Sequence, residues 1–173
     1  MTTNHIKLPG VHNVENYLAA ISVVDGMVPD EIIQDFAGTF QGVEHRIELI
    51  RTRKGVRWYN DSIASSPSRT IAGLNSFHQK VILIAGGKDK GISYESLGPV
   101  INERVKLLLL CGANYNGLES LDVEDYQEAV SLADSHSREG YVVLLSPAST
   151  SFDRFANFMD RGKTFKNIVN QLP

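Results

Sequence analysis

The chain has 173 residues, of which 42% are hydrophobic and 21% are charged, the ordinary balance of a globular protein with a buried core. Its formal net charge is −3, so no basic surplus indicates nucleic acid or an anionic membrane as a partner. The single cysteine, Cys111, excludes an intrachain disulfide and a multi-thiolate metal site. No signal-peptide pattern opens the sequence, and no apolar run approaches the ~20 residues of a membrane span, so we expect a cytoplasmic protein.

Helical patterns come first along the chain. Apolar residues recur at helical spacing over residues 12–24, and Pro29-Asp30-Glu31 opens a second predicted helix that ends near Gly38. From His45 onward, two short apolar segments bracket Lys54-Gly55, which predicts a β-hairpin. The change of pattern predicts a boundary near Gly42-Val43, so residues 1–42 are interpreted as the tail of another domain and residues 43–173 as the main domain.

Three continuous apolar runs then predict strands that are buried on both faces of a parallel sheet. They cover residues 81–85, 105–110 and 141–145. Helices are predicted between and after these strands, at residues 66–77, 94–102, 123–137 and 152–172. Strands that alternate with helices after an opening hairpin favour an α/β fold with a three-layer, Rossmann-like and mostly parallel sheet.

Polar segments follow three of the predicted strands, where ligands gather in open α/β sheets. Asp61 in Asn60-Asp61-Ser62 suits a ribose hydroxyl, a metal-bound water or a cationic partner, but equally a simple turn. The glycine-rich residues 86–91 suit an anionic ligand or only a turn. Residues 146–153 precede a helix whose amides suit an anion, with Ser151 or Asp153 as its N-cap.

Two residues near the start of the chain also leave alternatives open. Asn13 suits either a contact with a base edge or a cap of the first helix, and Arg46 suits either a phosphate clamp or an unpaired surface position. No P-loop spacing, no Ser-His-Asp constellation and no metal-ligand cluster occurs in the sequence. We therefore predict no metal site in this chain and no ordinary means of cradling a nucleotide triphosphate.

Four motifs in order resemble the Mur ligase family. Residues 8–20 resemble G-x-H-N-x-x-N-x-x-A-A, residues 40–48 resemble F-x-G-x-x-H-R-x-E, and residues 59–62 resemble the start of N-D-S-K-A-T. Residues 146–162 closely resemble S-P-A-x-x-S-x-D-x-F-x-x-F-x-x-R-G, the pattern of the branch that adds D-glutamate. The resemblance covers essentially the whole chain, and the last motif is the most specific.

The resemblance implies an ATP-dependent amide-bond-forming enzyme of peptidoglycan precursor synthesis. In such a ligase ATP phosphorylates the carboxylate of UDP-N-acetylmuramoyl-L-alanine, and the amine of D-glutamate attacks the acyl phosphate. Residues 1–42 would be a helical remnant of the central ATP-binding domain, and residues 43–173 the amino-acid-binding domain. The implied partners are ATP, D-glutamate and the UDP-sugar, with Mg²⁺ bound by residues outside this chain and a monomer as the expected state.

Site residues follow from the resemblance position by position. Asn13 and Asn16 match the family's adenine-contacting asparagines. Arg46 matches the arginine that reaches the ATP phosphates, and Asp61 matches an aspartate on the nucleotide side, so both are also catalytic candidates.

On the amino-acid side, Lys90 is implied to meet the D-glutamate carboxylate and to be a third catalytic residue. Ser65, Ser151, Phe152 and Phe158 match the rest of the D-glutamate pocket.

Two positions depart from the family pattern. Ile63 stands where lysine is usual, so a positive charge is missing beside Asp61, and Lys88 and Arg69 are the candidates to supply it. Ser65 stands where threonine is usual, which keeps the hydroxyl.

Two alternative functions remain open. One is another Mur-type amide ligase, such as a folylpolyglutamate-synthase-like enzyme, and the other is a non-catalytic module that binds an amino acid or a nucleotide. Because a P-loop is absent, we expect the isolated chain to be inactive as a ligase.

Overall fold

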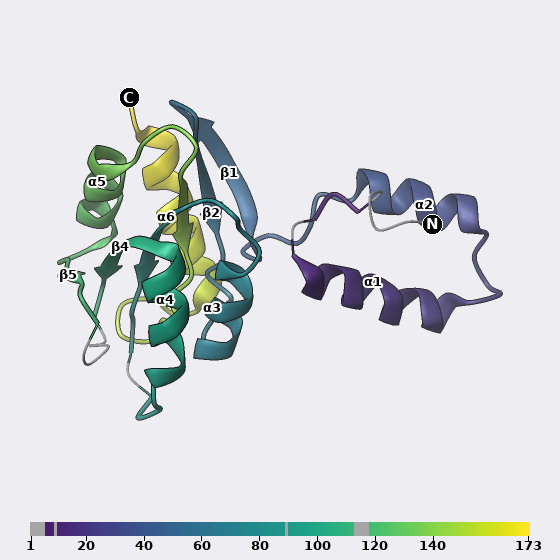
Figure 1. Cartoon of the computed structure of the whole chain (residues 1–173), viewed down its shortest axis with the longest axis horizontal. Helices are drawn as coiled ribbons and strands as arrows, with labels where there is room; N and C mark the ends of the chain where they lie inside the picture. The colour runs from purple at the N-terminus through teal and green to yellow at the C-terminus, as the bar shows by residue number, and fades with distance from the viewer. Residues whose placement is uncertain (1–5, 9, 89, 113–117) are drawn as a thin grey trace. The chain divides into compact units, whose positions relative to one another are not determined.

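The computed structural model describes residues 6–8, 10–88, 90–112 and 118–173 (Figure 1). The chain forms two compact units, which we call the helical unit (residues 1–42) and the α/β unit (residues 43–173). Each is described by itself. Within the described residues, no helix has the length and apolar character needed to cross a membrane.

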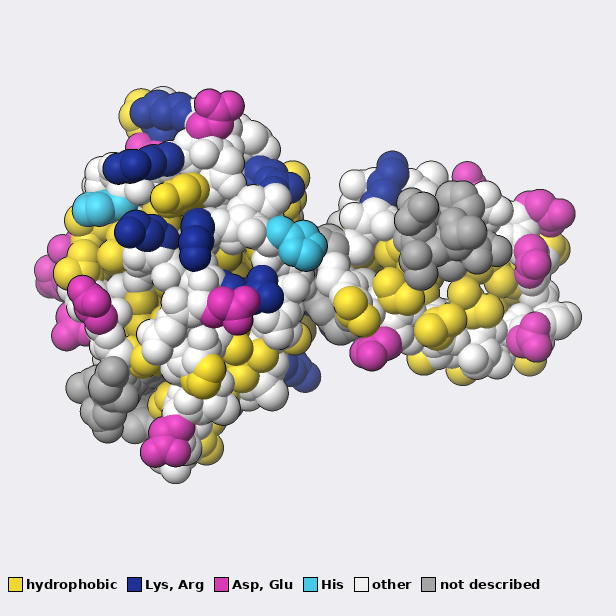
Figure 2. All heavy atoms as spheres, in the orientation of Figure 1, with side chains coloured by type: hydrophobic (Ala, Val, Ile, Leu, Met, Phe, Trp, Pro, Cys, Tyr) yellow, Lys and Arg dark blue, Asp and Glu magenta, His cyan; other side chains and the backbone are white. Residues whose placement is uncertain are grey.

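The helical unit consists of α1 (Val11–Val24) and α2 (Asp30–Thr39). The Tyr17 and Phe36 rings lie 6.4 Å apart between the two helices, and Phe36 stacks on Phe40 at 4.9 Å. Hydrophobic side chains nevertheless remain at the surface of this unit, as Figure 2 shows. The large ones that are exposed are Val11, Leu18, Val23, Met27, Ile32 and Phe36. Two helices provide too little area to bury both apolar faces.

The α/β unit is built on one sheet of six strands in the order β1-β2-β6-β3-β4-β5. The strands are β1 (Glu48–Arg53), β2 (Val56–Asn60), β3 (Val81–Ala85), β4 (Val105–Leu110), β5 (Leu121–Asp122) and β6 (Val142–Leu145). β1 and β2 form the antiparallel hairpin predicted around Lys54-Gly55, and every other neighbouring pair is parallel. The fold class is therefore confirmed as mixed α/β with a mostly parallel sheet.

Helices cover both faces of this sheet and make three layers (Figure 1). The covering elements are α3 (Pro67–Leu74), the 3₁₀ helix η2 (Glu95–Leu97) and α4 (Gly98–Arg104) on one face, and α5 (Tyr126–His136) and α6 (Phe158–Gln171) on the other. Side chains of β3 alternate between the two cores: Leu83 faces the α3–α4 side, and Ile82 and Ile84 face the α5–α6 side. This burial on both faces is the reason why β3 and β6 are continuously apolar.

Two details differ from the sequence prediction. The short edge strand β5 was not predicted, because two exposed residues carry no periodic signal. The last helix begins at Phe158 rather than at Phe152, because the Asn157 side chain caps it by accepting a hydrogen bond from the Asp160 amide at 2.8 Å. The expectation that Ser151 or Asp153 is the N-cap of this helix is therefore wrong.

Candidate functional site

The carboxyl ends of β2, β3, β4 and β6 lie at one edge of the sheet because these strands are parallel. β1 is antiparallel to β2, so the segment that precedes β1 reaches the same edge. Six of the residues predicted for the site lie in the segments at this edge, namely Arg46, Asp61, Ser65, Lys90, Ser151 and Phe152. These segments therefore lie at the edge where ligands gather in open α/β sheets.

Asp61 follows β2 and is almost completely buried. Its Oδ2 accepts a hydrogen bond from Ser146 Oγ at 2.8 Å, and its Oδ1 accepts one from the Ile47 amide at 3.3 Å. Ser146 Oγ also lies 3.0 Å from Thr70 Oγ1. This network joins the exits of β2 and β6 to α3, so Asp61 is more than part of a local turn.

Burial is the largest influence on the protonation of Asp61. It raises the pKa of Asp61 from its ordinary value to about 7, against the hydrogen bonds from Ser146 and Ile47 and the positive charges of Arg46 and Arg69. Arg69 also donates a hydrogen bond to the Ile63 carbonyl at 3.4 Å. Of the two candidates for the missing lysine charge, Arg69 thus acts on Asp61.

Lys90 and Ser65 lie together although they are distant in sequence. Lys90 Nζ donates a hydrogen bond to the Ser65 carbonyl at 2.6 Å, and the Lys90 side chain is exposed. A flexible ammonium group held by one exposed carbonyl remains available to a carboxylate. This contact places the positive charge of Lys90 beside Ser65 at the strand edge.

The glycine-rich segment after β3 packs against the segment after β6. The Lys88 amide donates to the Thr150 carbonyl at 3.0 Å, and the Gly86 amide donates to the Pro147 carbonyl at 3.0 Å. At Gly87, where φ is 139°, an added Cβ would lie 2.3 Å from the Thr150 carbonyl oxygen. Gly87 therefore permits a close approach between the two loops.

The residues predicted for the rest of the D-glutamate pocket differ in exposure. Ser151 is buried, and its carbonyl accepts hydrogen bonds from the amides of Arg154 and Phe155. Phe152 is 63% exposed, whereas Phe158 is half-buried at the start of α6. The Phe158 ring meets the His45 ring edge-on at 6.0 Å.

Arg46 is exposed at the same edge, between two residues with left-handed backbone. The φ angles of His45 and Ile47 are 67° and 47°. Such values are rare for residues with a side chain, and most of all for a β-branched one. The position of Arg46 is therefore held by its surroundings rather than by local preference.

Asn13 and Asn16 belong to the helical unit, and the structure does not relate them to this edge. Both lie within α1, where Asn16 Nδ2 donates to Asn13 Oδ1 at 3.5 Å. The N-cap of α1 is Gly10, without a side-chain cap. The alternative that Asn13 caps this helix is therefore wrong.

Arg161 is a functional candidate that the sequence analysis did not single out. It is 1% exposed on α6, and its guanidinium donates to Ser62 Oγ at 3.0 Å, to the Ser62 carbonyl at 2.9 Å and to the Ser149 carbonyl at 3.1 Å. A single buried arginine thereby joins the loops after β2 and β6. Its place in the Arg-Gly end of the last motif was the available signal.

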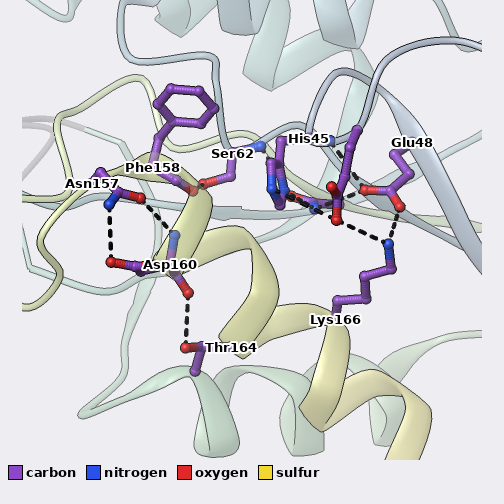
Figure 3. Close-up of polar contacts among 10 residues, drawn as sticks. His45, Glu48, Ser62, Asn157, Phe158, Asp160, Thr164 and Lys166 are labelled. Atoms are coloured by element: carbon purple, nitrogen blue, oxygen red, sulfur yellow. Dashed lines mark hydrogen bonds and ion pairs between the residues drawn. The ribbon is translucent and has the colours of Figure 1, made fainter.

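A second group that sequence reasoning did not find consists of Glu44, His45, Glu48 and Lys166, of which Figure 3 labels the last three. One possible ligand atom from each of Glu44, His45 and Glu48 lies within 4.8 Å of the others, a grouping that resembles a metal site. Lys166 Nζ, however, makes ion pairs with Glu48 and, at 3.4 Å, with Glu44. An ammonium group thus already supplies the positive charge that a metal would bring.

The tautomer of His45 follows from its neighbour. Asn60 Oδ1 accepts from the Ser62 amide at 3.1 Å, so Asn60 Nδ2 is the atom that lies 2.8 Å from His45 Nδ1. Nδ1 must then accept, and the ring proton belongs on Nε2, which faces Glu44 at 3.8 Å. In this arrangement both ring nitrogens of His45 have protein neighbours.

Residues 45–149 match the family described as "Mur ligase, glutamate ligase domain". The chain belongs to the Mur ligase family. It is 52% identical over 184 residues to the UDP-N-acetylmuramoylalanine--D-glutamate ligases of Ruminiclostridium cellulolyticum and of Acetivibrio thermocellus. Each match covers 96% of this chain and 40% of the relative, so the chain spans about 40% of the length of the curated relatives it matches.

Solved Mur ligases share the fold. MurF from Acinetobacter baumannii superposes with a TM-score of 0.68 at 16% identity over 96% of this chain and 39% of that one. UDP-N-acetylmuramate-alanine ligase MurC from Thermotoga maritima superposes with a TM-score of 0.67 at 19% identity over 94% of this chain and 38% of that one. These two likenesses concern the fold alone.

Proposed function

We propose that this Mur ligase chain is the D-glutamate-receiving part of an ATP-dependent ligase that extends UDP-N-acetylmuramoyl-L-alanine, in the cytoplasm. The observation that carries the proposal is the pairing of Lys90 with Ser65 at the strand edge to which Ser151 and Arg46 also belong. The name of the 52% identical relatives supports the choice of D-glutamate. The catalytic step needs further residues that this chain does not supply.

D-glutamate carries two carboxylates and one amine, so its site needs cationic or hydrogen-bonding groups apart from the reacting nitrogen. In the proposal the exposed ammonium of Lys90 binds one carboxylate, and Ser65 and Ser151 contribute hydroxyl or backbone groups. Phe152 and Phe158 form an apolar wall for the methylene groups. Fixing both carboxylates leaves the amine directed at the activated carbonyl, which is catalysis by orientation.

On the nucleotide side, Arg46 in the proposal neutralises charge on the phosphates as the amine forms its bond with the carbonyl carbon and phosphate leaves. Asp61 is too deeply buried to present a free carboxylate, and we assign it the role of holding the loops around Arg46. Asn13 and Asn16 of the helical unit are proposed to contact adenine. The helical unit would then belong to the ATP-binding domain.

Among the described residues, the group of three possible ligands formed by Glu44, His45 and Glu48 does not fit Mg²⁺. This group contains a histidine, and both of its carboxylates already pair with Lys166, whereas Mg²⁺ prefers oxygen ligands. In the proposal the ligands of Mg²⁺ belong to the part of the ligase outside this chain.

A chimera tests the proposal. The matched 40% of the Ruminiclostridium cellulolyticum relative is replaced by this chain, and ADP release is measured with UDP-N-acetylmuramoyl-L-alanine and each of several amino acids. We expect release that depends on D-glutamate, while the 173-residue chain alone shows none. A chimera that prefers another amino acid, or that binds ligands without turnover although the parent ligase is active, would overturn the assignment.

A further inference from the structure

The conformation of residues 44–48 needs support from outside the segment. His45 and Ile47 both have left-handed backbone, and Arg46 lies between them. A free segment would relax to ordinary φ values and redirect the Arg46 side chain. The groups that prevent this relaxation therefore determine where the Arg46 charge lies.

Glu48 holds the His45 half of the segment. Its Oε2 accepts hydrogen bonds from the His45 amide at 3.1 Å and from Asn60 Nδ2 at 3.1 Å. The same Asn60 amide group meets His45 Nδ1 at 2.8 Å. Glu48 thus fixes both the backbone of His45 and the amide that fixes its ring.

The loop that follows β2 also holds this segment. The Ile47 amide donates to Asp61 Oδ1 at 3.3 Å, and the Ile63 amide donates to the His45 carbonyl at 3.2 Å. These bonds come from the exit of β2, so the segment is attached to the sheet on one side. The other side faces α6.

Lys166 connects α6 to this arrangement, as Figure 3 shows. Its ammonium group bonds to Glu48 Oε1 and lies 3.4 Å from Glu44 Oε1, so it joins the first and last residues of the segment. Gly162, one helical turn earlier on α6, leaves room for the His45 ring, since a Cβ there would lie 2.3 Å from Nδ1. One face of α6 thereby supplies both the space and the charge.

The charge state of Glu48 agrees with this geometry. Burial by itself would raise the pKa of Glu48, but the hydrogen bonds from Lys166, the His45 amide and Asn60 together lower it. Glu48 therefore remains an ionised acceptor, which its three donors require.

We propose that Glu48 and Lys166 act as a clamp that positions Arg46 for the ATP phosphates. The inference rests on the proposed function for the role of Arg46, whereas the clamp itself rests on the contacts above. Glu48 and Lys166 are positioning residues, because neither is required to touch a substrate.

The first test measures the clamp without turnover. Amide hydrogen exchange and the ring nitrogen signals of His45 are recorded by NMR in the 173-residue chain and in Lys166→Met. We expect exchange at the His45 amide to become about fivefold faster, because a partly exposed ion pair has been removed. Lys163 is an exposed lysine on the same helix, so Lys163→Met is the matched control and should leave exchange at the His45 amide unchanged. Unchanged exchange in Lys166→Met would refute the clamp.

The second test measures positioning in the chimeric ligase. Lys166→Met and Glu48→Gln should each raise the KM for ATP about fivefold and leave the KM for D-glutamate unchanged. The effect of the double variant should be smaller than the sum of the two single effects, because the two residues share the Lys166–Glu48 contact. Equal changes in both KM values, or none, would overturn the positioning role.

The two tests separate the clamp from the proposed function. A wild-type chimera that lacks D-glutamate-dependent ADP release contradicts the proposed function, and with it the role of Arg46, whereas the exchange measurement still decides the clamp. An active chimera whose KM for ATP ignores both substitutions contradicts the positioning role alone.

Discussion

The strand edge of the α/β unit has two halves that are held in different ways. The β1–β2 half, residues 44–48 and 60–65, is fixed largely by buried side chains such as Asp61 and Asn60. The β3–β6 half, residues 86–88, 90–91 and 146–152, is paired largely through backbone amides and carbonyls. Backbone pairing leaves the side chains of Lys90 and Phe152 exposed. We call the first half the frame half and the second the ligand-presenting half, because in the proposed function its exposed side chains meet D-glutamate.

Removing Arg161 should destabilise both halves of the strand edge, because its guanidinium bonds to Ser62 in one half and to Ser149 in the other. We expect Arg161→Met to lower the free energy of unfolding by about 4 kcal/mol, since buried carbonyls lose charged donors. Urea denaturation of the 173-residue chain measures this. Arg138→Met, at an exposed position, is the control and should change it by less than about 0.5 kcal/mol. A similar small loss for both variants would contradict the joint role of Arg161.

Filling the space at Gly162 should damage only the frame half. Alanine normally favours a helix over glycine, but here its Cβ would lie 2.3 Å from His45 Nδ1. We expect Gly162→Ala to destabilise the chain by about 3 kcal/mol in the same denaturation experiment. Gly98→Ala, whose Cβ would meet only Leu118 at 3.6 Å, should be nearly neutral. Equal free energies of unfolding for the two variants would contradict the expected clash between the Cβ added at Gly162 and the His45 ring.

The buried acid of the frame half should give stability a distinctive pH dependence. The pKa of Asp61 is raised to about 7 in the folded chain, so the folded state binds more protons than the unfolded state at intermediate pH. The contribution of Asp61 to the free energy of unfolding is then fully present below the pKa of this residue in the unfolded chain, and it is lost as the pH rises through about 7.

We expect this contribution to fall by about 2 kcal/mol between pH 5 and pH 7 and to disappear in Asp61→Asn. Urea denaturation across this pH range is the measurement, with the exposed Asp122→Asn as control. Glu48, whose pKa is lowered, acts in the opposite direction and at lower pH. If the free energy of unfolding of the Asp61→Asn chain changed with pH as it does in the unsubstituted chain, Asp61 would not be the source of this pH dependence.

The smallest stability effect is expected in the ligand-presenting half. Lys90→Ala removes one exposed hydrogen bond to the Ser65 carbonyl and should cost about 0.5 kcal/mol. In the chimeric ligase the same change should raise the KM for D-glutamate at least about tenfold and spare the KM for the UDP-sugar. Equal loss for both substrates would reassign Lys90 to the phosphates.

Most of the fold was predictable because its signals are local. Continuous apolar runs marked β3, β4 and β6, and Lys54-Gly55 marked the hairpin. The start of α6 was not predictable from periodicity, since residues 152–157 have a helix-like pattern, and only the Asn157 cap places the start at Phe158. β5 has two residues and depends on its neighbour β4 for its existence.

The sequence by itself determined the sheet, its helical layers and the segments that meet at the strand edge, because periodicity and parallel topology depend on residue type and order. Only the tertiary structure decided which side chains meet across that edge. The bond from Arg161 to Ser62 and the ion pair of Lys166 with Glu48 join residues that are distant in sequence. No local pattern encodes such pairs, since their energy comes from burial and geometry that exist only after the layers have packed.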